Sequence, residues 1–448
     1  MGMARKGTIG CSPLARLGVI ALGATLWGTD AGSAWAGGAD SPATAVLQQM
    51  QIMQTQIHAL EQKVNSQELR NAEKDSEIRA LRKQVEQTSQ DLTSLPAYDF
   101  LKEVKLSGYM AATLTENFDN PSTQANLLRT FDINAHSFNT EAFKLTLQKD
   151  PTEASRAGFR VDIFGGRTAR LLGFATANTP VGTNNLGNFE LEQAYVTYKA
   201  DVGKGLDLYA GKFVTLLGAE VLESPLNYNI SRSILFGFAI PFTHTGLRAT
   251  YAFNDKWNAT VGVNNGWDNE DENNHGFSYE GRLAWVPSDK FNIAVNTIYG
   301  PELAGNEADK RGVLDVVATW KPTEKLTLLG NFDWGQQHNA PFDLNGDGIP
   351  EFRQTATWTG AALVANYDFT NRFGLAVRGE YFEDRQGFRT GLRQNAWEYT
   401  ITPHYQLTPK LLTRVEMRGD YSDMKYFLRS QTPNRHQETI LGEVVYLF

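Results

Sequence analysis

The chain has 448 residues, a formal net charge of −8 at neutral pH and a single cysteine. The acidic balance argues against nucleic acid as a partner, and one cysteine cannot form an intrachain disulfide, an iron–sulfur cluster or a thiolate zinc site. Beyond the N-terminus no apolar run reaches about 18 residues, which excludes transmembrane helices. The mean hydropathy of −0.37 is compatible with a β-barrel, because a barrel strand exposes only every second residue to lipid.

Residues 1–36 have the pattern of a secretory signal peptide. A basic start precedes the apolar stretch LGVIALGATLWG, and the small-residue site AWA follows it. Cys11 lies before the apolar stretch, a position that does not fit a lipid anchor. Cleavage after Ala36 removes this cysteine and leaves residues 37–45 as a short linker.

Residues 46–95 carry a heptad repeat with a polar interruption in the middle. The a and d positions are Val46, Met50, Met53, Ile57, Leu60, Val64, Gln67, Asn71, Lys74, Ile78, Leu81, Val85, Thr88, Leu92 and Leu95. The flanking g and e′ positions pair opposite charges, namely Lys63 with Glu68, Arg70 with Asp75, and Glu77 with Arg82. The apolar a and d positions and the charged g and e′ positions follow the same register, which predicts a parallel α-helical coiled coil. The alternative is a single solvated helix or a disordered linker. Pro96 ends the helix, and we expect residues 96–103 to form a hinge.

From Val104 to the C-terminus, apolar and polar residues alternate with the period of a β-strand, as in VKLSGYMAATLT. Sixteen such stretches lie at about 104–115, 138–149, 155–165, 189–200, 204–216, 241–254, 257–267, 274–286, 289–299, 311–321, 324–335, 355–369, 371–384, 393–408, 409–421 and 436–448. The last stretch ends on the aromatic residue Phe448, where most domains end in polar residues.

The connections between these stretches alternate in length. Seven short ones, DPTEAS, ADVGKG, NDK, PSDK, KPTEK, FTN and LTPK, are rich in turn residues. Eight long ones lie at about 116–137, 166–188, 217–240, 268–273, 300–310, 336–354, 385–392 and 422–435. Aromatic residues at strand ends suit the two interfacial girdles of a membrane barrel, namely Trp257, Trp285, Trp320, Trp334, Tyr251 and Tyr299. We therefore expect residues 104–448 to form an all-β transmembrane β-barrel of about 16 antiparallel strands with both termini in the periplasm; a soluble sandwich or propeller is the alternative.

Residues 187–251, which begin GNFELEQAYVTYK and end HTGLRATY, resemble the core of the OmpL-like putative beta-barrel porins. GYMAATLTENFDNPS and YEGRLAWVPSDKFNIAVNTIYGPE extend the resemblance over most of residues 106–448. The resemblance implies an outer-membrane pore without naming a solute. The terminal Phe448 is similar to the signal read by the barrel-assembly machinery of the outer membrane. The N-terminal coil is similar to the periplasmic extensions of trimeric porins, so we expect a homo-oligomer, with a trimer favoured.

The third long connection is a candidate constriction, because in many porins of this size that loop folds into the barrel. Its polar half carries Glu220, Glu223, Asn227, Asn229 and Arg232. The apolar run from Ile234 to Ile240 would be unfavourable in water, and we expect it to pack against the wall or a neighbouring subunit. A plain surface loop is the alternative.

The polar face of each strand predicts the lumen wall. It carries seven basic and eight acidic side chains: Lys144, Arg160, Asp162, Arg248, Glu280, Arg282, Asp315, Asp333, Arg378, Glu380, Glu398, Arg414, Glu416, Arg418 and Asp420. Facing lipid, charges would cost a few kcal/mol each near the midplane, so this face is expected to point inward. A mixed wall creates a transverse field that orients polar solutes, and the alternative is that these charges pair with one another as struts.

The segment FDLNGDGIPEFRQ resembles an oxygen-rich calcium loop. Asp343, Asn345 and Asp347 occupy positions 1, 3 and 5, and Glu351 at position 9 is a further candidate ligand. Position 12 is Gln354 where such loops have Glu, so an ion-free turn is the alternative.

These features predict a porin in the outer membrane, with a periplasmic coiled coil, that passes small hydrophilic solutes by passive diffusion and requires no cofactor apart from the candidate calcium. The alternative is a structural anchor that tethers the outer membrane to the cell wall through the coil. The sequence has no GxSxG, HExxH or P-loop motif, and we expect no enzymatic activity.

Overall fold

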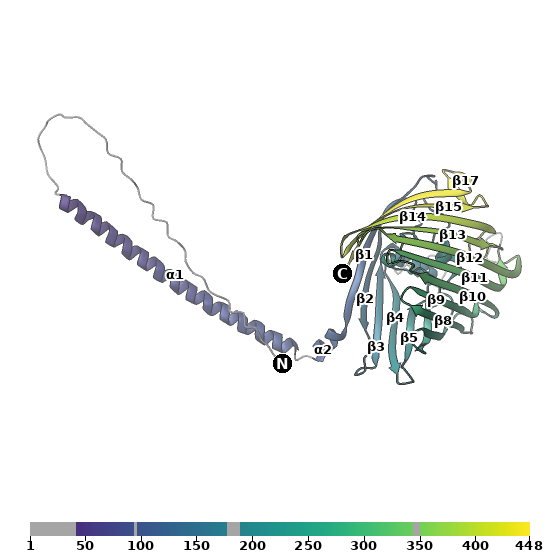
Figure 1. The fold of residues 1–448 in the computed structure, drawn as a ribbon, viewed down its shortest axis with the longest axis horizontal. Coiled ribbons are helices and arrows are strands. Elements are labelled where there is room, and N and C mark those ends of the chain that lie inside the picture. The colour runs from purple at the N-terminus through teal and green to yellow at the C-terminus, as the bar shows by residue number, and fades with distance from the viewer. Residues whose placement is uncertain (1–41, 94–95, 177–188, 344–349) are drawn as a thin grey trace, which may run out of the picture. The chain divides into compact units, whose positions relative to one another are not determined.

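The computed structural model describes residues 42–93, 96–176, 189–343 and 350–448. The predicted signal peptide and most of the linker lie outside the described residues. The chain forms two units, an N-terminal helix and a β-barrel (Figure 1). Among the described residues, no helix has the length and apolar content needed to span a bilayer.

The N-terminal unit is a single helix, α1, that spans Pro42–Thr93. The predicted helix is therefore confirmed, whereas its association with other copies stays a prediction. Most apolar side chains of the heptad stripe are at least half exposed in the single chain, including those of Met50, Met53, Ile57, Leu60, Val64, Leu81 and Val85. The stripe thus has no partner within the part of the chain that the structure describes.

The expected hinge is a short helix, α2, at Pro96–Glu103. The missing N–H and fixed φ of proline suit the first helical position, so Pro96 begins this helix after α1 has ended. The ring of Phe100 stacks on that of Phe159 at 6.1 Å, and Glu103 pairs with Lys149 at 3.1 Å. These two contacts hold α2 to the barrel.

Sixteen antiparallel strands form a closed barrel, as predicted. They are β1 Lys105–Asn117, β2 His136–Lys149, β3 Ala157–Gly165, β4 Phe189–Ala200, β5 Leu206–Val214, β6 Thr243–Ala252, β7 Trp257–Asn264, β8 Ser278–Ser288, β9 Phe291–Leu303, β10 Asn306–Trp320, β11 Leu326–Phe342, β12 Phe352–Asp368, β13 Phe373–Asp384, β14 Gln394–Thr408, β15 Leu411–Ser422 and β18 His436–Leu447. A separate hairpin, β16 Phe427–Arg429 and β17 Thr432–Asn434, lies in the last connection.

The barrel closes where the last strand, β18, pairs with β1. The ladder runs from Tyr109 opposite Leu447 to Asn117 opposite Thr439. The backbone of Phe448 extends it by exchanging two hydrogen bonds of 3.1 Å with Gly108. A Cβ at Gly108 would lie 2.1 Å from the carbonyl oxygen of Lys144 and 2.7 Å from the ring of Phe448, so only glycine fits at this closure point.

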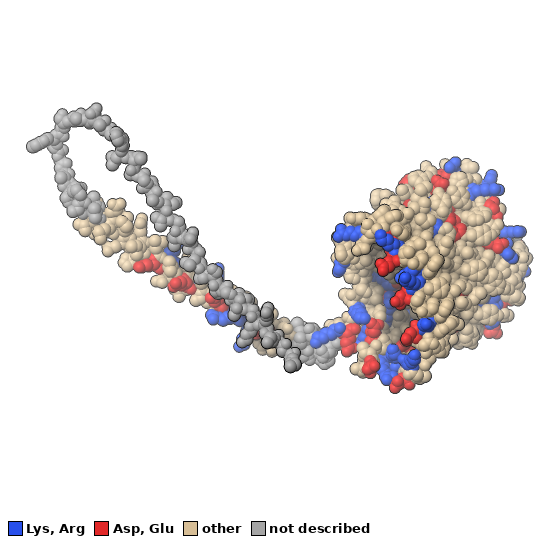
Figure 2. Space-filling model, viewed as in Figure 1, with Lys and Arg blue, Asp and Glu red and all other residues tan. Residues whose placement is uncertain are grey.

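The two faces of the barrel wall differ in chemistry, as the alternating pattern predicts. On β15 the side chains of Val415 and Met417 are exposed on the outside, whereas Arg414, Glu416 and Arg418 are buried inside. Figure 2 shows charged side chains gathered in and around the hollow of the barrel, while much of the visible outer wall carries none. A closed cylinder with an apolar outside and a charged inside is suited to a lipid bilayer.

Connections at one end of the barrel are short and those at the other end, which we call the loop end, are mostly long, which confirms the predicted alternation. The predicted long connection at about 300–310 is wrong, and the one at about 336–354 is shorter than predicted. Strands β9 and β10 continue to Leu303 and Asn306, and β11 and β12 continue to Phe342 and Phe352. Their outer parts are polar, so the apolar alternation ends before the hydrogen-bonded ladder does.

Candidate functional site

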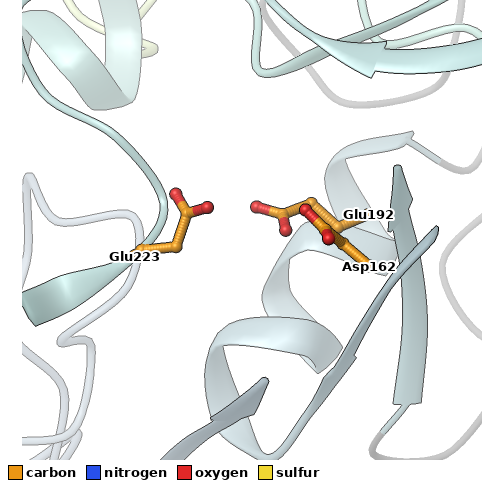
Figure 3. Close-up of side chains that lie close together, drawn as sticks. All are labelled: Asp162, Glu192 and Glu223. Carbon is orange, nitrogen blue, oxygen red and sulfur yellow. The ribbon is translucent and has the colours of Figure 1, made fainter. Parts of the chain in front are cut away.

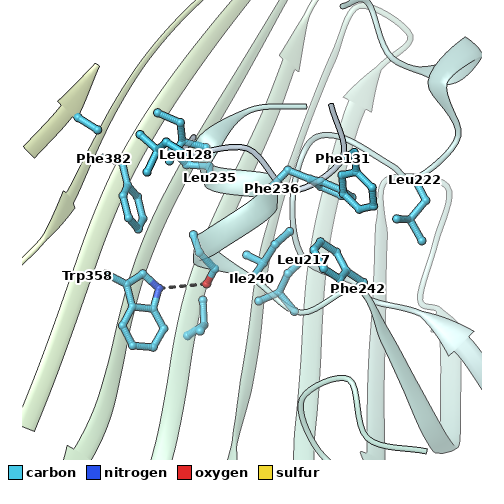
Figure 4. Close-up of a cluster of buried hydrophobic side chains, with 14 of the residues drawn as sticks. Leu128, Phe131, Leu217, Leu222, Leu235, Phe236, Ile240, Phe242, Trp358 and Phe382 are labelled. Atoms are coloured by element: carbon cyan, nitrogen blue, oxygen red, sulfur yellow. Dashed lines mark hydrogen bonds between the residues drawn. The ribbon is translucent and has the colours of Figure 1, made fainter. Parts of the chain in front are cut away.

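The connection between β5 and β6, residues 215–242, lies inside the barrel and not on its surface. We call it the inner loop. It contains a 3-10 turn, Ser224–Leu226, and a π-helical turn, Leu235–Ala239. Figure 4 shows its apolar side chains packed against the barrel wall, where the indole Nε1 of Trp358 donates to the carbonyl of Ala239 at 3.0 Å. This packing gives the apolar run a dry environment inside the fold.

Three arginines of the wall hold the inner loop through its backbone. Arg378 Nη1 donates to the carbonyl of Ser231 at 2.8 Å, and Arg418 Nη1 donates to that of Arg232 at 2.6 Å. Arg414 Nη1 donates to the carbonyl of Asn227 at 2.7 Å. These bonds supply hydrogen-bond donors to buried carbonyl oxygens that water does not reach.

Two carboxylates of the same wall hold the amides of the loop. Glu416 accepts from Ile230 N at 2.6 Å and from Ser231 N at 3.0 Å. Glu380 accepts from Ile234 N at 2.6 Å and from Leu235 N at 3.2 Å. Charges predicted to line the lumen on β13 and β15 thus form the supports of a buried loop.

A lysine-centred cluster joins the inner loop to a second part of the wall, formed by β2, β3 and β4. Lys144 Nζ of β2 lies 3.0 Å from Asp162 of β3 and 2.5 Å from Glu192 of β4, and it also pairs with Glu223 of the loop. Figure 3 shows the three carboxylates converging from separate elements. Their ligand atoms all lie within 4.8 Å of one another. Such a triad could hold a divalent cation, but the ammonium group of Lys144 already supplies the positive charge.

Sequence reasoning missed Glu192 because a β-bulge changes the alternation. The β3–β4 register passes from Asp162 opposite Gln193 to Ile163 opposite Leu191, which skips Glu192. Both Glu192 and Gln193 therefore point inward, where strict alternation allows only one of them. A second bulge in β2 skips Glu141 in the same way and buries it.

The five predicted constriction residues fall into two groups. Glu220 and Glu223 line a pocket of about 210 Å³ on the open side of the inner loop. The other three are buried and bond within the fold: Asn227 to Val221, Asn229 to Thr402, and Arg232 to the carbonyls of Leu222 and Ile230. These three shape the loop. The two glutamates line the pocket but also bond within the fold, Glu223 to Lys144 and Glu220 to Arg378 at 2.6 Å.

The wall of β3, β6 and β8 is where predicted lumenal cations remain partly accessible. Arg160 pairs with Asp162 at 2.9 Å and borders a polar pocket of about 240 Å³, and Arg248 pairs with Glu280 at 2.7 Å. Arg282 lies on the pocket beside the inner loop. Its Nη1 donates to Asn296 at 3.2 Å, and no described carboxylate is within 4.0 Å of its guanidinium. The remaining predicted wall residues, Asp315, Asp333, Glu398 and Asp420, are buried inside the barrel.

The predicted calcium loop cannot be assembled from the described residues. Asn345 and Asp347 lie outside them, while Asp343 and Glu351 flank the gap at the ends of β11 and β12. The calcium site therefore stays a prediction.

Comparison with known proteins identifies similar barrels. A family model described as putative beta-barrel porin-2, OmpL-like, matches residues 103–448. A comparison with curated proteins finds no match. Among solved structures, the outer-membrane channel DcaP of Acinetobacter baumannii is 10% identical, with a TM-score of 0.52 over 77% of this chain and 97% of that chain. The anion-selective porin from Comamonas acidovorans is 11% identical, with a TM-score of 0.54 over 77% and 99%.

OprB of Pseudomonas putida is a third similar structure, 12% identical, with a TM-score of 0.51 over 79% of this chain and 96% of that chain. At these identities the structural likeness shows the barrel fold alone.

Proposed function

Because this chain belongs to the OmpL-like family of putative beta-barrel porins, we propose that it forms a water-filled channel in the outer membrane through which small hydrophilic solutes diffuse passively. The observation that carries the proposal is a closed barrel of 16 strands with a charged interior and an internal loop held to its wall. Fixed charges on a wet wall act on a passing solute without chemical turnover.

The path that we propose runs between the inner loop and the wall of β6 and β8. The opposite wall is occupied, because its arginines and glutamates bind the loop backbone. Glu220 and Glu223 border the opening on the loop side, and Arg282 borders it on the wall side. Since acidic and basic groups face each other there, we infer that this is the narrow point of the channel.

We also propose that the protein is a homo-oligomer, with a trimer favoured, and that α1 forms a coiled coil in the periplasm. The exposed heptad stripe of α1 supports this, because such a stripe is stable in water only when it is covered. The terminal Phe448 would serve as the signal for the barrel-assembly machinery.

The rival proposal, a sealed barrel that anchors the membrane to the cell wall, is not supported by the comparisons. Single-channel recording in planar bilayers separates the two. Steady openings support the porin, and silence from protein that retains heat-modifiable β-structure contradicts it.

The position of the path can be tested with Arg282→Gln. Loss of an arginine without a carboxylate partner should shift the reversal potential in a salt gradient towards cation preference. Arg385→Gln is the matched control, since Arg385 is exposed and paired with Glu383 at 3.0 Å. Equal reversal potentials in both variants would place the path elsewhere.

A further inference from the structure

Two arginines share one indole ring inside the loop end of the barrel. The guanidinium carbon of Arg311, on β10, lies 4.9 Å from the ring centroid of Trp267. That of Arg389, in the connection 385–393, lies 4.7 Å from the same centroid. The two cations are therefore within ~10 Å of each other, which is close for like charges in a partly dry site. Trp358 and Phe388 complete the aromatic surface around them.

Neither arginine has an ion-pair partner within 4.0 Å among the described residues. Each uses its Nε to bond a neutral acceptor: Arg311 donates to Gln337 Oε1 at 2.9 Å, and Arg389 donates to the carbonyl of Phe238 at 2.5 Å. The terminal nitrogens make no hydrogen bond to a described residue. None of them is among the buried atoms that lack a partner, so they reach solvent.

Three carboxylates lie nearby, but each is held by other donors. Glu302 accepts from the backbone N–H of Trp267 and from Ser278 Oγ, both at 2.6 Å. Asp268 accepts from two backbone N–H groups, at 2.6 and 3.0 Å. Asp384 accepts from the backbone N–H groups that follow it in its own loop, at 2.8 to 3.0 Å. These carboxylates lower the local positive potential without contacting either guanidinium.

The uncompensated charge also affects the pKa of Arg389. Burial and the neighbouring Arg311 lower the pKa of Arg389 from its usual value to about 9. An anion that supplies the missing counter-charge stabilises the charged form of such a guanidinium.

We propose that Arg311 and Arg389 form a binding site for small oxyanions, either organic carboxylates or phosphate, inside the loop end of the barrel. The Nη groups of an arginine match the paired oxygens of both anions. Aromatic rings behind the guanidinium groups hold their orientation. The site lies apart from the opening beside Arg282, and its occupancy does not depend on whether the barrel conducts.

The test is calorimetric titration of the full-length protein in detergent micelles at low salt, with sodium succinate and with inorganic phosphate as separate probes. Saturable binding of either probe is expected in the wild type. Arg311→Gln and Arg389→Gln should each weaken it roughly tenfold or more, since each removes charge-assisted hydrogen bonds. Arg385→Gln, in the same connection as Arg389, should leave the affinity unchanged.

Arg389→Lys separates recognition from folding. It keeps the charge but loses the planar fork, so it should bind more weakly than the wild type while retaining heat-modifiable β-structure. Binding by succinate alone, by phosphate alone or by both would identify which oxyanion fits. The proposal is overturned if neither probe gives saturable heat at tens of millimolar, or if the Arg389 variants bind as the wild type does.

Discussion

Replacing Lys144 by methionine tests whether the lysine-centred cluster holds the inner loop in place. Methionine keeps the length of the side chain but removes the charge that Asp162, Glu192 and Glu223 share. Asp162 keeps Arg160 at 2.9 Å and Gln193 at 2.7 Å. The other two carboxylates therefore lose the positive charge that compensates them. Glu192 is fully buried and has no other partner among the described residues.

Breaking a buried ion pair from one side costs about 3–5 kcal/mol, because the remaining charge is left without compensation. The side chains of Lys144 and Glu192 are 4% and 0% exposed, so little screening by solvent is expected. We therefore expect the Lys144→Met barrel to unfold in urea with a free energy lower by this amount. The supports of the loop on β13 and β15 remain, including the bond of 3.0 Å from Arg414 to the carbonyl of Ser224, so only the segment before Ser224 should be released. Single-channel currents should then become larger or noisier.

Lys105→Met is the matched control. Lys105 pairs with Asp150 at 2.6 Å, but both side chains are largely exposed, 72% and 45%. An exposed pair contributes about 0–1 kcal/mol. If the two variants lose the same stability, or if currents through Lys144→Met match the wild type, the cluster does not restrain the loop.

The same variant gives a second readout through metal binding. Without the ammonium group, three carboxylates within 4.8 Å of one another form an oxygen-rich site of the kind that calcium prefers. Calcium should therefore raise the unfolding midpoint of Lys144→Met and not that of a Lys144→Met/Glu192→Gln double variant. If calcium shifts the unfolding midpoint of both variants equally, the three carboxylates do not form a site together.

Three further outcomes are expected. Burial raises the pKa of Asp268 to about 7, so the folded state binds more protons between about pH 4 and 7 and its stability should fall as pH rises through that window. The fall should be on the order of 4 kcal/mol, and Asp268→Asn should abolish it in urea titrations. Deleting residues 40–95 should lower the oligomer mass in detergent ultracentrifugation, and an unchanged mass would remove α1 as the assembling element. Deleting Phe448 should reduce barrel assembly in cells, with little change in the urea midpoint of protein refolded in vitro; normal assembly would contradict the signal role.

The barrel could be predicted from sequence because its determinants are local and periodic. Alternating side chains on β15, for example, already separate Val415 and Met417 from Arg414, Glu416 and Arg418. The bulges could not be predicted in this way. One extra residue changes which side chains face inward, and nothing in the order of residues 189–200 marks where the ladder skips.

Contacts between segments that are distant in the chain could not be predicted from the sequence either. The pairing of Lys144 with Glu223 joins residues 79 positions apart. The approach of Arg311 and Arg389 to Trp267 depends on how the connections that carry Trp267 and Arg389 fold against β10. Residue types suggested that charges line the interior, but only the closed fold shows which of them meet.

The position of the inner loop decides what each interior arginine does. Arg378, Arg414 and Arg418 have the same side chain and the same inward direction as Arg160, Arg248 and Arg282. The first three are at most 3% exposed, because the loop backbone covers them. The last three are not covered in this way and stay partly accessible, although Arg282 lies at the edge of the loop, with its Nη1 3.5 Å from the carbonyl of Leu216. A charge pattern that looks uniform along the strands is thus divided by a single connection into a structural half and a half that remains available to solutes, which is why variants of the two halves should affect stability and selectivity, respectively.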